Sequence, residues 1–229
     1  MPISVYGYPH LMDLSGRVRF TCPVKFGLVQ LNVINLAPSQ RGSRLELAIR
    51  GNITFGGKAL IRSNTKIYVD DVASLSIGHN LRLGAGIIIN CLHRIEIGEA
   101  VRIGHGSQLL DSNLHYLLDM KRRRVAPLHK KIIIGSHCWL TNRVSVYGGA
   151  VIPPYSVVAS GSLVNKDLNA CGPNNILGGS PCRVLASDIR LVNNYERERL
   201  IAEYYRLYPD GSYPVEDEID ENSWFINPS

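Results

Sequence analysis

The sequence lacks the features that mark secreted, disulfide-rich and membrane-spanning proteins. Its five cysteines are scattered without a CxxC pair, which favours reduced thiols in the cytoplasm over a disulfide framework. No apolar run approaches the roughly 18 residues that a membrane span needs, so we expect no stable membrane insertion. The first residues show no basic segment followed by an apolar one, and we therefore expect no signal peptide.

Charge is modest but unbalanced in this chain of 229 residues. Asp, Glu, Lys and Arg make up 19% of the chain, and the formal net charge is +6. A basic balance favours anionic partners, although ordinary solubility explains it equally well. The hydrophobic fraction of 45% supplies a sizeable core, so the bulk of the chain is expected to fold.

The dominant pattern is a short repeat between residues 134 and 167. An aliphatic residue returns at every sixth position: Ile134, Leu140, Val146, Ile152, Val158 and Val164. Neither the period of a helix nor that of a single strand produces this spacing. A fixed short repeat is typical of a solenoid whose units bury apolar side chains against one another. Six residues suit one face of a three-sided parallel β-helix, with Gly and Pro at the corners.

The repeat begins upstream, less regularly, with related phrases at 53–56 (ITFG), 75–78 (LSIG), 95–98 (IEIG) and 132–135 (IIIG). We therefore expect an all-β chain in three parts. Residues 1–52 form an N-terminal arm and capping strands, and residues 53–185 form the β-helix. Residues 186–229 form a C-terminal helix and an acidic tail. The helix is predicted over 194–207, with Asn193 as its N-cap and Glu196 completing a capping box.

The repeat is interrupted once, at 110–131, by about one coil's worth of residues with the wrong periodicity. An extended loop on a rigid scaffold is a usual place for chemistry. This loop holds His115 and a basic run, Lys121 to Arg124, followed by Lys130 and Lys131. We interpret the run as a solvated loop or a contact for the acidic tail at Glu216–Glu221, in preference to attraction of an anionic acceptor. Nucleic-acid binding is not expected, because no aromatic residues interleave with the run.

Four segments carry a resemblance to a known family: LLDSNLH (109–115), IIIGSHCWL (132–140), VVASGSLVNKD (157–167) and GGSPCRV (178–184). With the six-residue repeat, they resemble the hexapeptide-repeat acyltransferases, in the branch of galactoside, maltose and polysaccharide O-acetyltransferases. The resemblance implies a left-handed parallel β-helix, a homotrimer with active sites between subunits, acetyl-CoA as acyl donor, and no metal.

The resemblance also implies roles for individual residues. His115 matches the catalytic histidine, a general base suited to physiological pH. Asp111 orients the loop or the histidine ring, with turn capping as an equal alternative. Asn90 and His93 are candidates, by position alone, for a further polar residue contributed by the neighbouring subunit. Five positions match acetyl-CoA contacts: Trp139 bordering the cleft, Asn142 and Ser160 near the pantetheine, and Lys166 and Arg183 at the phosphates.

These residues favour an O-acetyltransferase acting on a sugar, or on a nucleotide-linked or lipid-linked saccharide precursor. An N-acetyltransferase of a nucleotide-linked amino sugar stays open as an alternative. A zinc-dependent carbonic anhydrase of the same fold is disfavoured, because none of the seven histidines shows the required five-residue spacing. A non-catalytic trimeric scaffold is disfavoured by the joint presence of His115, Lys166 and Arg183.

Overall fold

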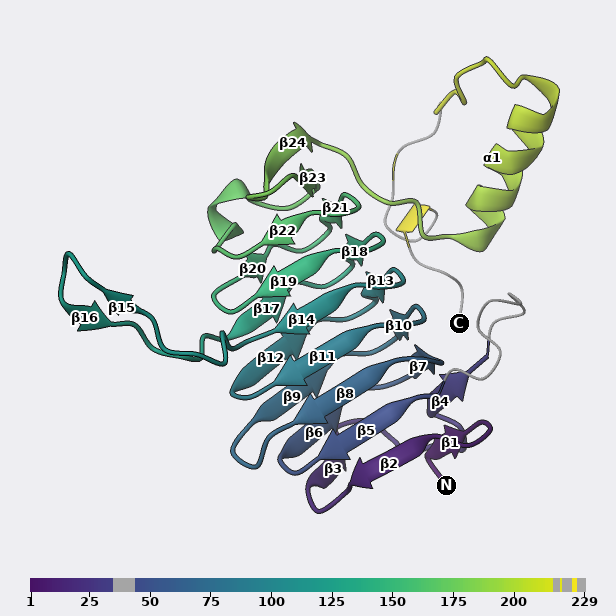
Figure 1. Cartoon of the computed structure of the whole chain (residues 1–229). Helices are drawn as coiled ribbons and strands as arrows, with labels where there is room; N and C mark the ends of the chain where they lie inside the picture. Colours follow the sequence, from purple (N-terminus) through teal and green to yellow (C-terminus); the bar gives the residue numbers. More distant parts are fainter. Residues whose placement is uncertain (35–43, 216–218, 220–223, 226–229) are drawn as a thin grey trace. The chain divides into compact units, whose positions relative to one another are not determined.

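A computed structural model describes residues 1–34, 44–215, 219, 224 and 225 of the chain. The chain divides into two compact units, Met1–Ile189 and Arg190–Ser229. The first unit is a solenoid of short strands that pair in parallel from one coil to the next (Figure 1). The predicted parallel β-helix is therefore confirmed.

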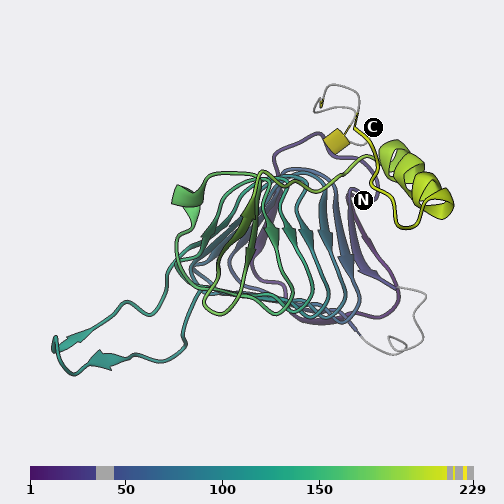
Figure 2. The same cartoon turned by 90° about the horizontal axis from the view of Figure 1, so that it is seen from above.

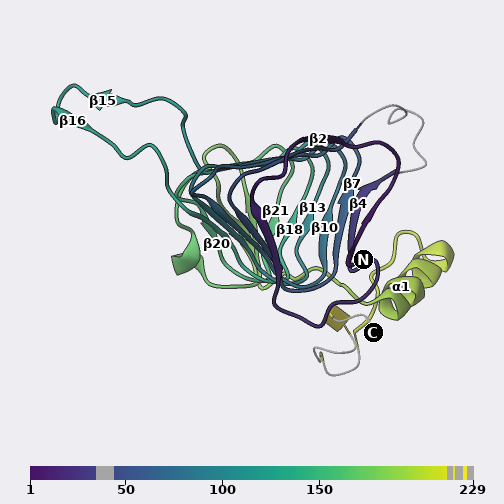
Figure 3. The same cartoon turned by 90° about the horizontal axis from the view of Figure 1, so that it is seen from below.

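The solenoid has three faces, which we name A, B and C in the order in which each coil visits them. Viewed along the axis, the coils stack over one another (Figures 2 and 3). Face A carries β1 (Ile3–Val5), β4 (Val29–Val33), β7 (Ala59–Arg62), β10 (Leu81–Leu83), β13 (Arg102–Ile103), β18 (Trp139–Leu140), β21 (Val157–Val158), β23 (Asn175–Gly178) and the antiparallel β24 (Arg183–Ser187). Face B carries β2 (His10–Asp13), β5 (Glu46–Ile49), β8 (Lys66–Val69), β11 (Ile88–Cys91), β14 (Gln108–Leu110), β19 (Ser145–Tyr147) and β22 (Leu163–Val164). Face C carries β3 (Arg17–Phe20), β6 (Asn52–Phe55), β9 (Ser74–Ile77), β12 (Arg94–Ile97), β17 (Ile132–Ile134) and β20 (Val151–Ile152).

The core is a set of stacked aliphatic columns inside these faces. On face B, cross-strand register places Ile67, Ile89, Leu109, Val146 and Val164 directly above one another, and all five are buried. Burial of each such side chain contributes about 1.5–3 kcal/mol. Because successive strand residues point to opposite sides, the neighbours of each core residue face outward. The repeat thus fixes which residues are available on the outer surface of each face.

The solenoid extends further toward the N-terminus than residue 53. Strands β1, β2 and β3 already occupy faces A, B and C, and each pairs in parallel with the next coil. These strands begin at residues 3, 10 and 17, a spacing of seven that departs from the six-residue repeat. A further insertion separates β4 from β5. Both irregularities conceal the repeat in this part of the sequence.

The loop predicted at 110–131 leaves face B after β14 and returns at β17 on face C. Its outer part is an antiparallel hairpin of β15 (Leu118–Asp119) and β16 (Arg124–Val125), which projects from one corner of the solenoid (Figures 1 and 2). A short 3-10 helix, η2 (Asn169–Cys171), follows β22.

The second unit contains helix α1 (Tyr195–Leu207), close to the predicted span. The predicted N-cap is wrong by one residue. The side chain of Asn194 accepts the backbone N–H of Arg197 at 3.1 Å, whereas the backbone N–H of Asn193 donates to the carbonyl of Trp224 at 3.0 Å. Of the predicted acidic tail, Glu216–Glu221, only Ile219 is among the described residues. None of the helices in the described part of the chain has the length and apolar character needed to cross a bilayer.

Candidate active site

The root of the protruding loop is held by Asp111, whose side chain is fully buried. Its Oδ1 accepts the backbone N–H of Leu92 at 2.8 Å, and its Oδ2 accepts those of His93 and Arg94 at 2.9 and 2.7 Å. One carboxylate therefore satisfies three backbone amides at the corner of the preceding coil. Of the roles considered for Asp111, this geometry favours capping of the turn at residues 92–94, which also holds the loop's root, over contact with the His115 ring.

His115 lies just beyond this root, with an exposed side chain. Two contacts fix the segment that carries it. The buried hydroxyl of Ser112 accepts the backbone N–H of Leu114 at 3.1 Å, and the backbone N–H of Asn113 donates to the carbonyl of Leu128 at 3.3 Å. The imidazole is thus presented to solvent by a backbone that is anchored to the returning segment of its own loop.

Two hollows on face B flank the segment before His115. The first, of about 580 Å³, lies on the side of β2, β5, β8 and β11 and is lined by Leu114; we name it the N-side hollow. The second, of about 630 Å³, lies on the side of β19 and β22 and is lined by Asn113; we name it the C-side hollow. His115 therefore follows two consecutive residues that border different hollows, although His115 itself lines neither.

The N-side hollow combines an apolar floor with polar groups. Its lining includes Asn90, one of the two residues selected by position alone. The Oδ1 atom of Asn90 is buried and has no hydrogen-bond partner among the described residues. A buried acceptor without a partner is costly, so this atom is suited to a donor supplied by a ligand. His93 does not line this hollow; its backbone N–H is bound to Asp111.

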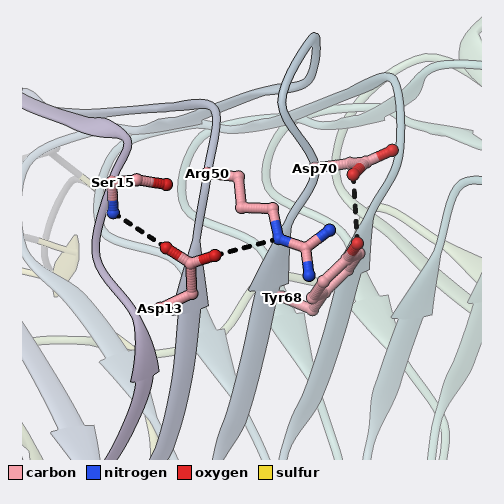
Figure 4. Close-up of polar contacts among 5 residues, drawn as sticks. All are labelled: Asp13, Ser15, Arg50, Tyr68 and Asp70. Carbon is pink, nitrogen blue, oxygen red and sulfur yellow. Dashed lines mark hydrogen bonds and ion pairs between the residues drawn. The ribbon is translucent and has the colours of Figure 1, made fainter.

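A charged cluster borders the same hollow. Figure 4 shows the contacts within this cluster. The Nε atom of Arg50 donates to Oδ2 of Asp13 at 3.1 Å, and the Arg50 guanidinium lies 5.7 Å from the centroid of the Tyr68 ring. The Tyr68 hydroxyl donates to Oδ1 of Asp70 at 3.0 Å. The amide of Ser15 holds the pKa of Asp13 below its usual range, whereas burial and the bond to Asp70 raise the pKa of Tyr68.

The positions predicted to contact acetyl-CoA fall into three places. Asn142 and Ser160 line a hollow of about 420 Å³ at the corner between faces A and B, together with His105, Arg143 and Gly161. The hydroxyls of Thr141 and Ser160 are 2.9 Å apart, and Thr141 also donates to the carbonyl of Val158 at 2.8 Å. Gly161 also lines the C-side hollow, so this corner is continuous with the loop that carries His115.

Trp139 lies elsewhere, at one end of a hollow of about 490 Å³ on the outside of face A. Lys166 and Arg183 lie near the last coil, and both side chains are exposed. Burial raises the pKa of Cys182, the residue before Arg183, while the positive charge of Lys166 lowers it, so Lys166 lies within electrostatic reach of the thiol next to Arg183. The structure therefore brings Asn142 together with Ser160, and Lys166 near Arg183, but it places His115 in none of these groups.

The chain is similar to known proteins both in sequence and in structure. No protein-family model matches the chain. The galactoside O-acetyltransferase of Escherichia coli (strain K12) is 26% identical over 167 residues, which cover 73% of this chain and 77% of the relative. The galactoside O-acetyltransferase of Lactococcus lactis subsp. lactis (strain IL1403) is 33% identical over 114 residues, 47% of this chain and 53% of the relative. The polySia specific acetyltransferase NeuO matches in structure with a TM-score of 0.59 and 19% identity, over 93% of this chain and 95% of that one.

These matches support the predicted resemblance to the hexapeptide-repeat acyltransferases, near the galactoside O-acetyltransferases. The match to NeuO confirms the predicted fold, a left-handed parallel β-helix, and the sequence relatives confirm the predicted enzyme class, an acyltransferase. The six-residue repeat predicts which residues are buried, but it does not predict which outward-facing residues become neighbours. Arg50, Tyr68 and Asp13 come together only because β2, β5 and β8 are neighbours on face B. Among the described residues, no group of three or more His, Cys, Asp and Glu side chains is arranged to hold a metal ion.

Proposed function

We propose that this acyltransferase moves an acetyl group from acetyl-CoA to a hydroxyl of a saccharide, with His115 as the general base. The observation that supports the proposal is the anchored segment before His115, in which Asn113 and Leu114 border two different hollows of face B. A reaction between two substrates needs a base where their binding sites meet. Two sequence relatives of the chain are named as galactoside O-acetyltransferases, which supports a sugar hydroxyl as acceptor.

In the proposed reaction, the neutral imidazole of His115 removes the proton of the acceptor hydroxyl as its oxygen attacks the thioester carbonyl. The new C–O bond forms and the C–S bond breaks, so the leaving thiolate receives the proton from the imidazolium. General-base catalysis of this kind contributes roughly 10²–10⁴-fold. The side chain of His115 is exposed, so both substrates have access to it.

The acceptor fits the N-side hollow. Asn90 offers a buried oxygen without a partner, to which a sugar hydroxyl would donate. The half-buried ring of Tyr68, held by its bond to Asp70, offers an apolar surface for a sugar ring. Arg50 and Asp13 are already paired with each other, so they hold the rim of the hollow in a fixed arrangement before the sugar arrives.

The donor fits the opposite side of the loop. The pantetheine would follow the corner that carries Asn142 and Ser160 and reach His115 along the C-side hollow. Lys166 and Arg183, on the last coil, would bind the CoA phosphates, as a point charge and a planar fork. Trp139 lies on face A of the same chain, so it would border the cleft only from a neighbouring subunit.

A homotrimer supplies such a neighbour. The loop carries exposed apolar side chains close to His115, among them Tyr116 (70% exposed) and Met120 (80% exposed), which a second subunit would cover. A cyclic trimer repeats one heterologous interface three times and closes on itself. All five cysteines are free thiols, which supports the proposal that the protein is cytoplasmic.

The test is release of free CoA from acetyl-CoA with a panel of simple and nucleotide-linked sugars. The His115→Ala variant is expected to lose about 10²–10⁴-fold in acceptor-dependent release. His79→Asn is the matched control, because His79 is an exposed histidine on a different corner of the solenoid and should keep the wild-type rate. Equal activity of His115→Ala and wild type would refute the role of His115.

Substitution of Asn90 tests separately whether the N-side hollow binds the acceptor. Asn90→Ala is expected to raise KM for the sugar more than KM for acetyl-CoA, because Asn90 is proposed to contact only the acceptor. A variant with unchanged sugar KM would exclude Asn90 from the acceptor site.

A further inference from the structure

The N-side hollow, where the proposed acceptor binds, is balanced in charge. The charged residues that line it are two cations and two anions, and they form two ion pairs. Arg50 binds Asp13 (Figure 4) and Lys66 binds Glu46, each with a nitrogen–oxygen distance of 3.1 Å. A carboxylate or an ammonium group that entered the hollow would meet charges of both signs and gain little net attraction. The lining therefore favours a neutral ligand.

An apolar wall stands beside these ion pairs. Ile88 lies between Lys66 and Gln108 in the cross-strand register of face B, and it is 40% exposed although both neighbours are polar. Met12 (61% exposed) and Leu114 (55% exposed) border the same hollow. Three apolar side chains thus contact solvent within one concave surface. Such a surface is suited to an apolar group of a ligand.

Leu114 is held in a backbone conformation that disfavours leucine. Its φ is +61°, in the left-handed region where Cβ crowds the following carbonyl oxygen. Among the described non-glycine residues with positive φ, four are asparagines, and Leu114 is the only branched aliphatic one. Its side chain gains little burial in return, because more than half of it is exposed. A costly conformation that presents an apolar side chain to a hollow indicates a binding role for that side chain.

Asn90 supplies a polar group next to the apolar wall. It follows Ile88 by two residues on β11, so the two side chains point to the same side of the strand, about 7 Å apart. The Oδ1 atom of Asn90 has no hydrogen-bond partner among the described residues. The last torsion of an asparagine side chain has broad minima, so the carboxamide can turn this oxygen toward a ligand. The hollow therefore joins a hydrogen-bond acceptor to an apolar surface.

We propose that the N-side hollow selects a neutral N-acetylated amino sugar as the acceptor. The N–H of its acetamido group donates to Oδ1 of Asn90, and its methyl group packs against Ile88 and Leu114. An acetamido group is uncharged, and its N–H and methyl group lie on the same side of the planar amide, so it meets all three features of the lining. The inference rests on the proposed function in one respect, that this hollow holds the acceptor.

The test measures sugar binding to the full chain by saturation-transfer difference NMR, without acetyl-CoA. The probe is N-acetylglucosamine. Glucose, which lacks the acetamido group, and glucosamine, which carries a free amine, are the comparison sugars. In the wild type, the acetamido methyl protons should receive the most saturation of all the ligand protons. N-acetylglucosamine should bind about tenfold more tightly than either comparison sugar, since it adds a buried methyl group and a hydrogen bond.

Leu114→Asn separates binding from folding, because asparagine tolerates the left-handed conformation and lacks the apolar side chain. Its melting temperature should equal or exceed that of the wild type, while N-acetylglucosamine should bind about fivefold more weakly. Ile88→Thr should weaken the same binding and leave glucose binding unchanged. The matched control is Leu117→Asn, the same change at a residue of the same loop that is 66% exposed and does not line the hollow. It should bind like the wild type.

Three results would overturn the inference: a wild type that binds N-acetylglucosamine no better than glucose, unchanged binding in Leu114→Asn, or weakened binding in Leu117→Asn. A change of oligomeric state in Leu114→Asn, measured by size-exclusion chromatography, would place this side chain in a subunit interface and would also overturn it. Acetyl-CoA is absent from these measurements, so their failure leaves acetyl transfer to another sugar intact. Acceptor-dependent CoA release tests that transfer separately.

Discussion

Replacing Asp111 by Ala tests how the loop that carries His115 is anchored. The carboxylate accepts three backbone amides at 2.7–2.9 Å, from Leu92, His93 and Arg94. A hydrogen bond to a charged group contributes about 1.5–3 kcal/mol, and three bonds to one carboxylate are not independent. Because residues 92–94 lie at a partly exposed corner, water replaces some of what is lost. We therefore expect a local cost of about 3 kcal/mol.

Hydrogen exchange followed by mass spectrometry measures this cost at the corner itself. A local loss of about 3 kcal/mol corresponds to amide exchange roughly a hundredfold faster in the peptide containing residues 92–94. The control is Asp119→Ala. Asp119 accepts the amides of Lys121 and Arg122 at 3.0 and 2.8 Å, but in an exposed hairpin where water takes its place. Its removal should cost less than about 1 kcal/mol.

The reasoning fails if the exchange rate of residues 92–94 is the same in Asp111→Ala and wild type. It also fails if Asp119→Ala has the larger effect. Asp111→Asn refines the test, because its one carbonyl oxygen still accepts while its amide group meets a backbone donor. Its exchange rate should fall between those of the wild type and Asp111→Ala.

Three further predictions concern the core, the thiols and a corner glycine. Leu140→Ala should lower the free energy of unfolding by about 2–5 kcal/mol in denaturant titrations, since Leu140 is fully buried in the stack; a change below about 1 kcal/mol would contradict this. At pH 8, a thiol reagent should modify exposed Cys171 and leave Cys138 unmodified, because burial raises the pKa of Cys138 to about 12; peptide mapping that finds Cys138 labelled at the rate of Cys171 would contradict it. Gly104→Ala should lower the melting temperature, because its Cβ would lie 2.5 Å from the Thr141 carbonyl oxygen. It should also weaken CoA binding, because Thr141 precedes Asn142 at the proposed pantetheine corner. An unchanged melting temperature would show that the backbone at this corner can shift to accommodate a methyl group.

The sequence was most informative where the repeat is regular. Between residues 134 and 167 every sixth residue is aliphatic, so the coils and their buried positions followed directly from the spacing. The first coils were missed as coils because β1, β2 and β3 start seven residues apart. The N-cap was misplaced because two asparagines, Asn193 and Asn194, stand side by side and only their contacts distinguish them.

The outer surface was harder to predict, since it depends on which coils become neighbours. The ion pair of Arg50 with Asp13 joins residues 37 positions apart, and no spacing rule links them. The neighbouring arginines Arg82 and Arg102 on face A had a signal in the sequence. The phrases LRLG (81–84) and VRIG (101–104) repeat one coil apart, so they place Arg82 beside Arg102 and Gly84 beside Gly104. A row of outward-facing residues on a solenoid is thus visible when its residues repeat with the period of the coil.

The most direct test of the proposed active site is a crystal structure with CoA and a sugar acceptor bound. The proposal predicts pantetheine along the corner of Asn142 and Ser160, phosphates at Lys166 and Arg183, and the sugar in the N-side hollow. It also predicts a sugar hydroxyl within hydrogen-bond distance of the His115 imidazole. CoA bound away from the Asn142 corner, or a sugar hydroxyl out of reach of every His115 in the assembly, would contradict it.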